Sequence, residues 1–386
     1  MPNAQHGSAW SAGLPATGPF VIDVPEAELT DLNDRLAATR WPSDAPDAGW
    51  RYGAGLADVR RLVELWQAHD WRATEARLAR HDQVRVDCGG QILHAMRVRA
   101  DAPAGTVLLL HGWPSSFLEM LDLAELLARP DPVAYDVIVA SLPGFAFSGP
   151  LAVPGPSGAE IADMLIRLLE GLGVDRVWIH AYDIAASAGV RMALTAPQRV
   201  LGYHTTEPGL PRAVWPPADL TEPERAYLRY ADEWDRDEGG YMAMLSTRPH
   251  TLAYGLTDSP VGLAAWLFEK WWSWTLQPGQ GWDWTGPLTR TLLDTLTLYW
   301  VTGSVSGANR TYYRADIEGQ PIRTTDRVAQ PVGVARTTQA IEHAPRELAE
   351  RLFANIGVWN DLGLGGHFIA AERPDLIAAS LRTLMR

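Results

Sequence analysis

The chain has 386 residues, of which 47% are hydrophobic, and a formal net charge of −13 at pH 7. This size and composition favour one large globular domain, or one domain with an insertion, and exclude a disordered chain. The acidic balance argues against a nucleic-acid surface, and no apolar run approaches the roughly 20 residues of a membrane span. The single cysteine, Cys88, excludes an internal disulfide and a Cys-rich metal site. We therefore expect a soluble, cytoplasmic protein with a small neutral substrate.

Residues 1–80 are expected to form a helical N-terminal domain. The stretch "PEAELTDLNDRLAATRW" begins with a proline and acids, and "GLADVRRLVELWQAHDWRATEARLARH" repeats apolar residues at helical spacing. After it, "DQVRVDC" and "QILHAMRV" alternate polar and apolar residues around two glycines, which predicts a β-hairpin.

Strands and helices alternate through residues 81–207 and again through residues 326–386. The apolar strands are "TVLLLH", "DVIVASL", "RVWIHA", "VLGYHTT", "QPVGVAR" and one near "GVWND"; the helices are "GAEIADMLIRLLEGLG", one near 184–196, "APRELAERLFANI" and a final one. This order predicts an α/β fold with a mostly parallel, doubly wound sheet. Residues 208–325 are Trp-rich and helical without a strand pattern, which indicates a lid over the carboxyl ends of the strands, where open α/β sheets bind ligands.

An acid, Asp183, stands where the strand "VWIHA" meets the following helix. In the α/β-hydrolase arrangement, a nucleophile occupies such a turn between small residues, which here are Ala181 and Ala185. The pattern alone is weak, because both flanks are usually Gly. The alternative is that Asp183 merely caps the helix.

Two further motifs favour the nucleophile. "HGWP" follows an earlier strand, where the backbone N–H of Trp113 would form an oxyanion hole with that of Ile184, the residue after the nucleophile. In "LGLGGHF", His367 lies in a Gly-rich loop after the last strand, where the catalytic base is expected in chain order.

In these motifs and in others along the chain, the sequence resembles the soluble relatives of microsomal epoxide hydrolase, which have a helical N-terminal domain. The resemblance covers nearly the whole chain and rests on "LNDRLAATRWP", "GWRYG", "HDWRATEARL", "HGWPSSFLE", "LPGFAFSGP", "STRPHTLAYGLTDSPVGLAAWLFEKWWSWT", "LYWVTGSVSGANRTYY" and "GGHF". It implies Asp183 as nucleophile, His367 as base, and Tyr241 and Tyr312 as lid tyrosines that act as acids. Because Tyr313 adjoins Tyr312, that last register is good to one residue. Lid packing with a satisfied hydroxyl is the alternative for each tyrosine.

The chemistry is consistent with these assignments. A carboxylate opens an epoxide in an SN2 step, a phenol protonates the departing alkoxide, and water activated by the base then hydrolyses the ester to a vicinal diol. Neither a metal nor an organic cofactor is required.

The sequence departs from this family where the acid that orients the base should stand. Relatives have Phe-Pro-x-Glu or Asp after the strand "QPVGVAR", but here the corresponding run ends at Ala340. A different acid could serve, turnover could be slow, or hydrolysis could be lost. We favour Glu207, which follows the strand "VLGYHTT", because this chain resembles some haloalkane dehalogenases that have their orienting acid after the corresponding strand. The alternative is that Glu207 is a solvated acid in a loop. Glu342 is a second candidate and Asp361 a third.

The sequence does not exclude two other kinds of protein. One is a haloalkane-dehalogenase-like hydrolase, and the other is a noncatalytic or cyclising relative that binds a hydrophobic ligand. Ile184 lacks the side-chain N–H with which haloalkane dehalogenases bind halide at this position. This difference favours epoxide opening. The lid tryptophans suit a bulky or aromatic epoxide, in secondary metabolism or detoxification, and Tyr182, Trp271 and Trp272 are expected to line the pocket. The sequence leaves open whether the chain forms a homodimer.

Overall fold

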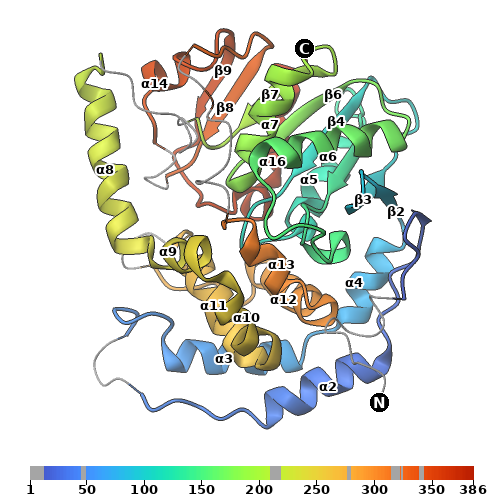
Figure 1. Ribbon diagram of the computed structural model, residues 1–386, viewed down its shortest axis with the longest axis vertical. Helices are drawn as coiled ribbons and strands as arrows, with labels where there is room; N and C mark the ends of the chain where they lie inside the picture. Colours follow the sequence, from blue (N-terminus) through green and yellow to red (C-terminus); the bar gives the residue numbers. More distant parts are fainter. Residues whose placement is uncertain are drawn as a thin grey trace.

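The computed structural model describes residues 13–44, 49–208, 219–275, 280–313, 322, 325–338 and 343–386. A sheet flanked by helices forms one end of the molecule, the lid helices α9 (Gly240–Thr247) to α13 (Val305–Arg310) lie in the middle, and the N-terminal helices α2 (Glu26–Ala37) and α3 (Leu56–Gln67) lie at the other end (Figure 1). The lid therefore separates the sheet from these two helices. The first lid helix, α8 (Glu222–Glu238), runs along one side of the molecule, level with the sheet (Figure 1).

The sheet has nine strands in the order β1-β2-β3-β5-β4-β6-β7-β8-β9. The first three of this order are antiparallel to their neighbours, and the strands from β5 to β9 run parallel, so the expected mostly parallel sheet is confirmed. The predicted hairpin is also present, with Asp82 opposite Arg97. The strands are β1 (Gly18–Pro19), β2 (Asp82–Asp87), β3 (Ile92–Val98), β4 (Thr106–Leu110), β5 (Asp136–Ala140), β6 (Val177–Ala181), β7 (Val200–Thr205), β8 (Val332–Arg336) and β9 (Ile356–Asp361).

Helices cover both faces of this sheet because its central strands are apolar on both. In β4, Leu108 and Leu110 belong to the core cluster that includes helices α6 (Gly158–Gly171) and α7 (Ile184–Thr195). The alternate residues Val107 and Leu109 belong to the cluster of α5 (Leu121–Leu127) and α16 (Pro374–Leu384). Each such side chain, when fully buried, contributes about 1.5–3 kcal/mol. The continuous apolar run of β4 thus reflects a strand buried on both sides.

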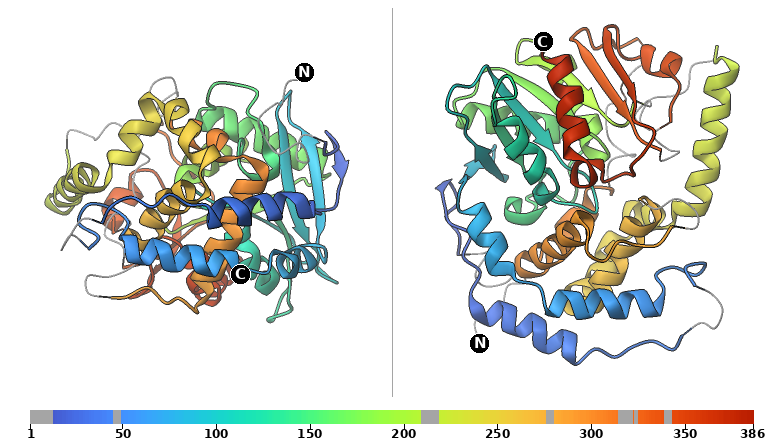
Figure 2. Two further views of the ribbon diagram at one scale, coloured as in Figure 1. Left: turned by 90° about the horizontal axis from the view of Figure 1, so that it is seen from below. Right: turned by 180° about the vertical axis from the view of Figure 1, so that it is seen from behind.

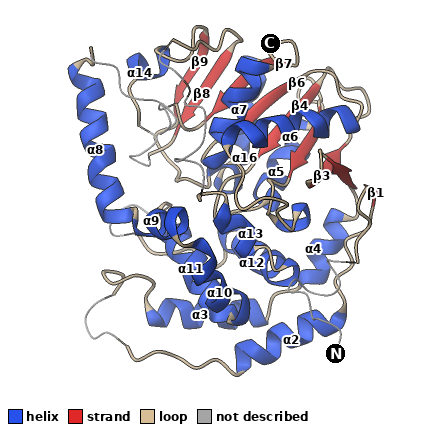
Figure 3. Cartoon of the chain, in the orientation of Figure 1, coloured by secondary structure: helices blue, strands red, loops and turns tan. Residues whose placement is uncertain are grey.

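The described part of residues 219–313 consists of helices joined by loops and contains no strand, as the sequence predicts (Figure 3). Its helices are α8 (Glu222–Glu238), α9 (Gly240–Thr247), α10 (Pro249–Asp258), α11 (Pro260–Ser273), α12 (Pro287–Thr302) and α13 (Val305–Arg310). The helices α10, α11 and α12 each begin with proline, whose missing N–H costs nothing in the first turn.

The N-terminal helices pack against the lid. Seen from below in Figure 2, α2 and α3 lie across the lid helices, and both contact α11. Trp50, just before α3, stacks on Trp272 of α11 with ring centroids 4.0 Å apart. The third N-terminal helix, α4 (Trp71–Leu78), leads into β2. No helix of the described residues is long and apolar enough to cross a membrane.

One helix is shorter than the sequence suggests. The pattern "APRELAERLFANI" predicts a helix of about three turns, but α14 spans only Arg346–Glu350. Val328 accepts a hydrogen bond from Ala354 and donates one to Leu352, so the backbone around Phe353 forms an isolated parallel bridge with Val328 instead of continuing the helix. The remaining short elements are η1 (Phe117–Met120), η2 (Ala146–Ser148) and α15 (Ile369–Glu372).

Candidate active site

Asp183 lies on a sharp turn between β6 and α7. Its backbone angles are φ 53° and ψ −141°, a region that residues other than glycine rarely adopt. Such local strain concentrates at functional sites, where it holds a side chain in a fixed direction. The flanking Ala181 and Ala185 are fully buried, so alanine meets the need for small side chains that glycine usually meets.

The loop after β4 closes on this aspartate. A Cβ atom at Gly112 would collide with the Asp183 side chain, so only glycine allows the approach. The backbone N–H of Trp113 donates to Asp183 Oδ1 at 2.8 Å. His111 braces the loop: its Nε2 accepts from the N–H of Leu142 at 3.2 Å, and burial lowers its pKa to about 4, so it stays neutral. Ile184, the other expected oxyanion donor, is the first residue of α7.

His367 lies in the glycine-rich loop after β9 and approaches Asp183. Its backbone N–H donates to the carbonyl of Trp274 at 2.8 Å, which fixes the loop to the end of α11. Its Nε2 lies 3.4 Å from Asp183 Oδ2, and only 6% of its side chain is exposed. The structure thus places the expected base beside the expected nucleophile.

Glu207 lies two residues beyond β7 and contacts both of these residues. Its Oε2 accepts from the backbone N–H of Asp183 at 2.7 Å, and its Oε1 lies 3.6 Å from His367 Nδ1. A direct hydrogen bond to the imidazole requires about 2.6–3.2 Å, so this contact is longer than one. The second and third candidates for the orienting acid are not seen beside His367. Asp361 pairs with Arg336 at the end of β8, and Glu342, like Ala340, lies outside the described residues.

The two lid tyrosines lie together over the Trp113 ring. Tyr241, in α9, stacks on Trp113 with a centroid distance of 4.8 Å, and Tyr312, after α13, meets the same ring edge-on at 5.6 Å. Their own rings are 5.7 Å apart. Both tyrosines are buried, whereas Tyr313 is 39% exposed, which favours Tyr312 in the register that the sequence leaves open.

Two tryptophans expected to line the pocket have structural positions instead. Trp272 stacks on Trp50 at the interface with the N-terminal helices, so its assignment to the pocket is wrong. Trp271 is fully buried, stacks on Phe368 at 4.1 Å and donates its indole N–H to the carbonyl of Pro114, so it holds the lid to the core.

Trp274, which the sequence did not single out, lies at the site. Its ring is 5.0 Å from that of His367, 5.3 Å from Tyr241 and 6.0 Å from Trp113. Helical spacing shows that the tryptophans of α11 face different directions, but which of them meets the base depends on how the lid crosses the core.

A buried acid, Glu119 of η1, also lies beside this constellation and was missed at the level of sequence. The hydroxyl of Tyr182 donates to its Oε2. Burial raises the pKa of Glu119 to about 7, although Ser115, Tyr182 and His367 act in the opposite direction. Tyr182 itself meets the His367 ring edge-on with centroids 5.2 Å apart, while its hydroxyl is engaged by this acid.

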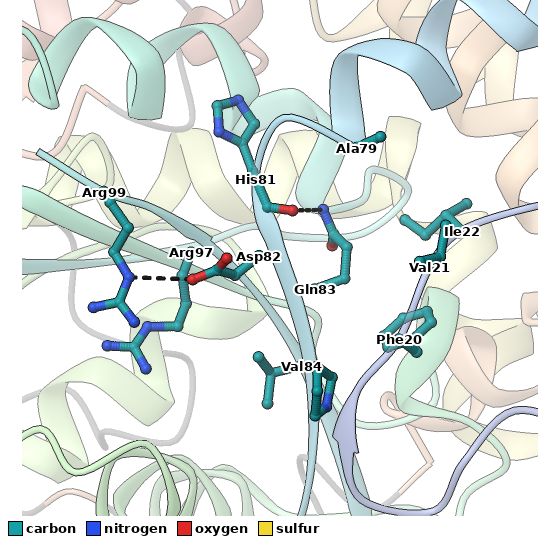
Figure 4. Close-up of a pocket in the computed structure, with 11 residues that line it drawn as sticks. Phe20, Val21, Ile22, Ala79, His81, Asp82, Gln83, Val84, Arg97 and Arg99 are labelled. Carbon is teal, nitrogen blue, oxygen red and sulfur yellow. Dashed lines mark hydrogen bonds and ion pairs between the residues drawn. The ribbon is translucent and has the colours of Figure 1, made fainter.

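A cavity of about 490 Å³ lies elsewhere, at the antiparallel edge of the sheet (Figure 4). Its walls come from residues 19–22, Ala79, residues 81–84, Arg97 of β3 and Arg99 just beyond it, and in it Arg99 pairs with Asp82 at 3.2 Å. Because Asp183 follows the central strand β6, this cavity is separate from the constellation described above.

Two family models match the chain. The model described as epoxide hydrolase N terminus matches residues 17–120, and the α/β hydrolase fold matches residues 105–244. A candidate epoxide hydrolase of Stigmatella aurantiaca is 35% identical over 380 residues, which are 95% of this chain and 84% of that protein. Epoxide hydrolase 1 of Sus scrofa is 27% identical, with 95% and 88% covered.

Solved structures agree with this relationship. Juvenile hormone epoxide hydrolase from Bombyx mori superposes with a TM-score of 0.84 at 25% identity, covering 96% of this chain and 94% of that one. The epoxide hydrolase of Aspergillus niger gives a TM-score of 0.81 at 26% identity, with 96% of each chain covered. With its N-terminal helices, hydrolase core and helical lid all matched, the chain belongs to the epoxide hydrolase family and has the α/β-hydrolase fold.

Proposed function

We propose that this epoxide hydrolase opens its substrate through a covalent ester on Asp183. The observation that carries the proposal is the pair of contacts at its carboxylate. Oδ1 accepts from the Trp113 N–H, and Oδ2 lies 3.4 Å from His367 Nε2. An oxygen held by a backbone donor is placed to become the ester carbonyl, which leaves Oδ2 as the attacking atom.

In the first step, Oδ2 attacks an epoxide carbon and the carbon–oxygen bond of the ring breaks. The departing alkoxide takes a proton from Tyr241 or Tyr312, whose rings adjoin each other over Trp113. A positioned acid of this kind contributes typically 10²–10⁴-fold. The products of this step are the alkyl ester on Asp183 and a tyrosinate.

In the second step, His367 takes a proton from water, and the hydroxide attacks the ester carbon of Asp183. The resulting oxyanion forms on Oδ1, where the N–H groups of Trp113 and Ile184 stabilise it; each such donor is worth about 3 kcal/mol. Collapse breaks the bond between this carbon and Oδ2, and the proton of the added hydroxyl group passes to Oδ2, which leaves as a hydroxyl of the diol while Asp183 returns to a carboxylate. The imidazolium returns its proton to the tyrosinate through solvent, and Glu207 stabilises the imidazolium meanwhile.

The aromatic side chains around Asp183 support a bulky or aromatic epoxide as substrate. The rings of Trp113, Tyr241, Tyr312 and Trp274 form one cluster, in which contacting rings have centroids 4.8–6.0 Å apart. Such walls bind flat apolar groups well. Ile184, in contrast, offers no side-chain donor for a halide, so dehalogenation is less well supported than epoxide opening.

Intact-mass analysis tests this proposal. The enzyme and its His367→Gln variant are incubated with a panel of aryl and alkyl epoxides. The variant should gain the mass of one substrate and keep it, because the ester forms but is not hydrolysed. His250→Gln, on the exposed side of α10, is the matched control and should turn over normally. If the wild type consumes a substrate and the His367→Gln variant retains no added mass, the covalent mechanism is refuted. If the wild type consumes none of the epoxides, a noncatalytic relative is favoured.

A further inference from the structure

Glu119 is a carboxylate buried directly behind the proposed site. It lies in η1, after the "HGWP" turn, and only 1% of it is exposed. Its Oε2 accepts from the hydroxyl of Tyr182, the residue before the nucleophile. Burying a carboxyl group costs free energy that an apolar side chain would not cost, so we expect it to have a role other than packing. The mechanism above leaves Glu119 without a role.

Tyr182 joins Glu119 to the base. The ring of Tyr182 meets the imidazole of His367 edge-on, with centroids 5.2 Å apart, while its hydroxyl is held by Glu119. The carboxylate and the imidazole thus both contact one buried tyrosine. Where water is excluded between two charges, their interaction is screened less than at the surface.

The other polar groups around this pair do not replace it. His367 is faced by Asp183 at Nε2 and by Glu207 at Nδ1. Tyr299 of α12 donates to the carbonyl of Ser115, and Glu372 of α15 accepts from the N–H of Gly366. The cation that acts on the Glu119 carboxylate is His367, which lowers its pKa, whereas the charge of Asp183 raises it.

We propose that Glu119 is a second, buried counter-ion of His367 and acts as a positioning residue in ester hydrolysis, an inference that rests on the function proposed above. Esterification removes the negative charge of Asp183 just before His367 must become an imidazolium. With that charge gone, ionisation of Glu119 is favoured, and the proton it loses goes to bulk water. The carboxylate then stabilises the imidazolium through the polarised Tyr182 hydroxyl and ring.

Replacing Glu119 with Gln tests this role. The rates of ester formation and ester hydrolysis are measured separately across pH by rapid quench and intact mass. Ester formation should be unchanged, and hydrolysis should slow about threefold to tenfold, which corresponds to about half to one pKa unit. Because a carboxylate raises the pKa of a nearby imidazole, its removal should also move the acid limb of hydrolysis to lower pH by about half a unit or more. A structural role would not move that limb.

Two further variants keep the test decisive. Tyr182→Phe keeps the ring but loses the hydroxyl, and it should move the acid limb in the same direction, even if the Glu119 variant fails to fold. Glu75→Gln removes another buried acid, which binds Val24 and Trp71 in the N-terminal domain, and should leave the limb in place. An unmoved limb in the Glu119 and Tyr182 variants overturns this inference alone, whereas a wild type that forms no ester overturns the proposed function.

Discussion

Replacing Glu207 with Gln should slow hydrolysis of the Asp183 ester far more than its formation. Glu207 makes two contacts, one with the backbone N–H of Asp183 at 2.7 Å and one with His367 Nδ1 at 3.6 Å. Glutamine keeps an oxygen that can accept from the backbone but loses the negative charge. The substitution therefore isolates the charge that faces the base.

The geometry sets the size of this effect. In a Ser-His-Asp enzyme, replacing the acid beside the base costs about 10⁴-fold in rate. The Glu207 carboxylate lies 3.6 Å from the ring nitrogen and its side chain is 26% exposed, so solvent weakens its interaction with an imidazolium. We expect hydrolysis to slow about 10²-fold, equivalent to about 2.7 kcal/mol, and ring opening to change less than about threefold.

Single-turnover rapid quench with intact-mass detection resolves the two steps, and ester should accumulate at steady state in the Gln variant. Glu207→Ala is the companion variant: it also strips the acceptor from the Asp183 N–H, and an unsatisfied donor costs about 1–3 kcal/mol, so it should slow both steps and lower stability. Equal rates of ester hydrolysis in the wild type and the Gln variant would refute the assignment of Glu207 as the orienting acid.

Three further outcomes are expected. Phe at Tyr241 or Tyr312 should slow ring opening by about 10²-fold and leave ester hydrolysis intact, since only the first step needs the proton; unchanged burst rates count against both. Trp271→Ala should lower the free energy of unfolding by about 3–5 kcal/mol in urea titrations, because that ring is fully buried against Phe368; a loss below 1 kcal/mol contradicts its anchoring role. Burial lowers the pKa of His94 to about 3 and of His111 to about 4, so the unfolded chain, whose histidines titrate near 6.5, binds protons first as pH falls. Unfolding free energy should then drop by about 1.4 kcal/mol per pH unit for each histidine below about pH 6.5, and pH-independent stability would contradict their buried, neutral state.

Much of the fold and the centre of the site could be predicted because both depend on local signals. The alternation of apolar strands and helices specifies a parallel sheet, and an acid at a strand-to-helix turn, a glycine-rich turn after an earlier strand and a late histidine occur in a fixed chain order. Asp183, Trp113 and His367 meet because the strands that carry them end at the same edge of the sheet.

What could not be predicted depends on contacts between distant segments. Glu119 and Tyr182 are 63 residues apart, and no spacing rule connects them. Trp272 and Trp274 lie two positions apart in an aromatic run, yet the first packs against the N-terminal domain and the second against the base. That division follows from the contacts of α11 with the N-terminal helices and of the residue after it with the His367 loop, which hydrophobic patterning does not encode.

The origin of the oxygen in the first diol tests the covalent ester on Asp183 most directly. Enzyme in excess over an aryl epoxide is allowed one turnover in heavy-oxygen water, and the diol is analysed by mass spectrometry. The account predicts an unlabelled diol in the first turnover, because its new oxygen is Oδ2 of Asp183, and label in the enzyme at that residue. A first diol that carries the solvent label would contradict it.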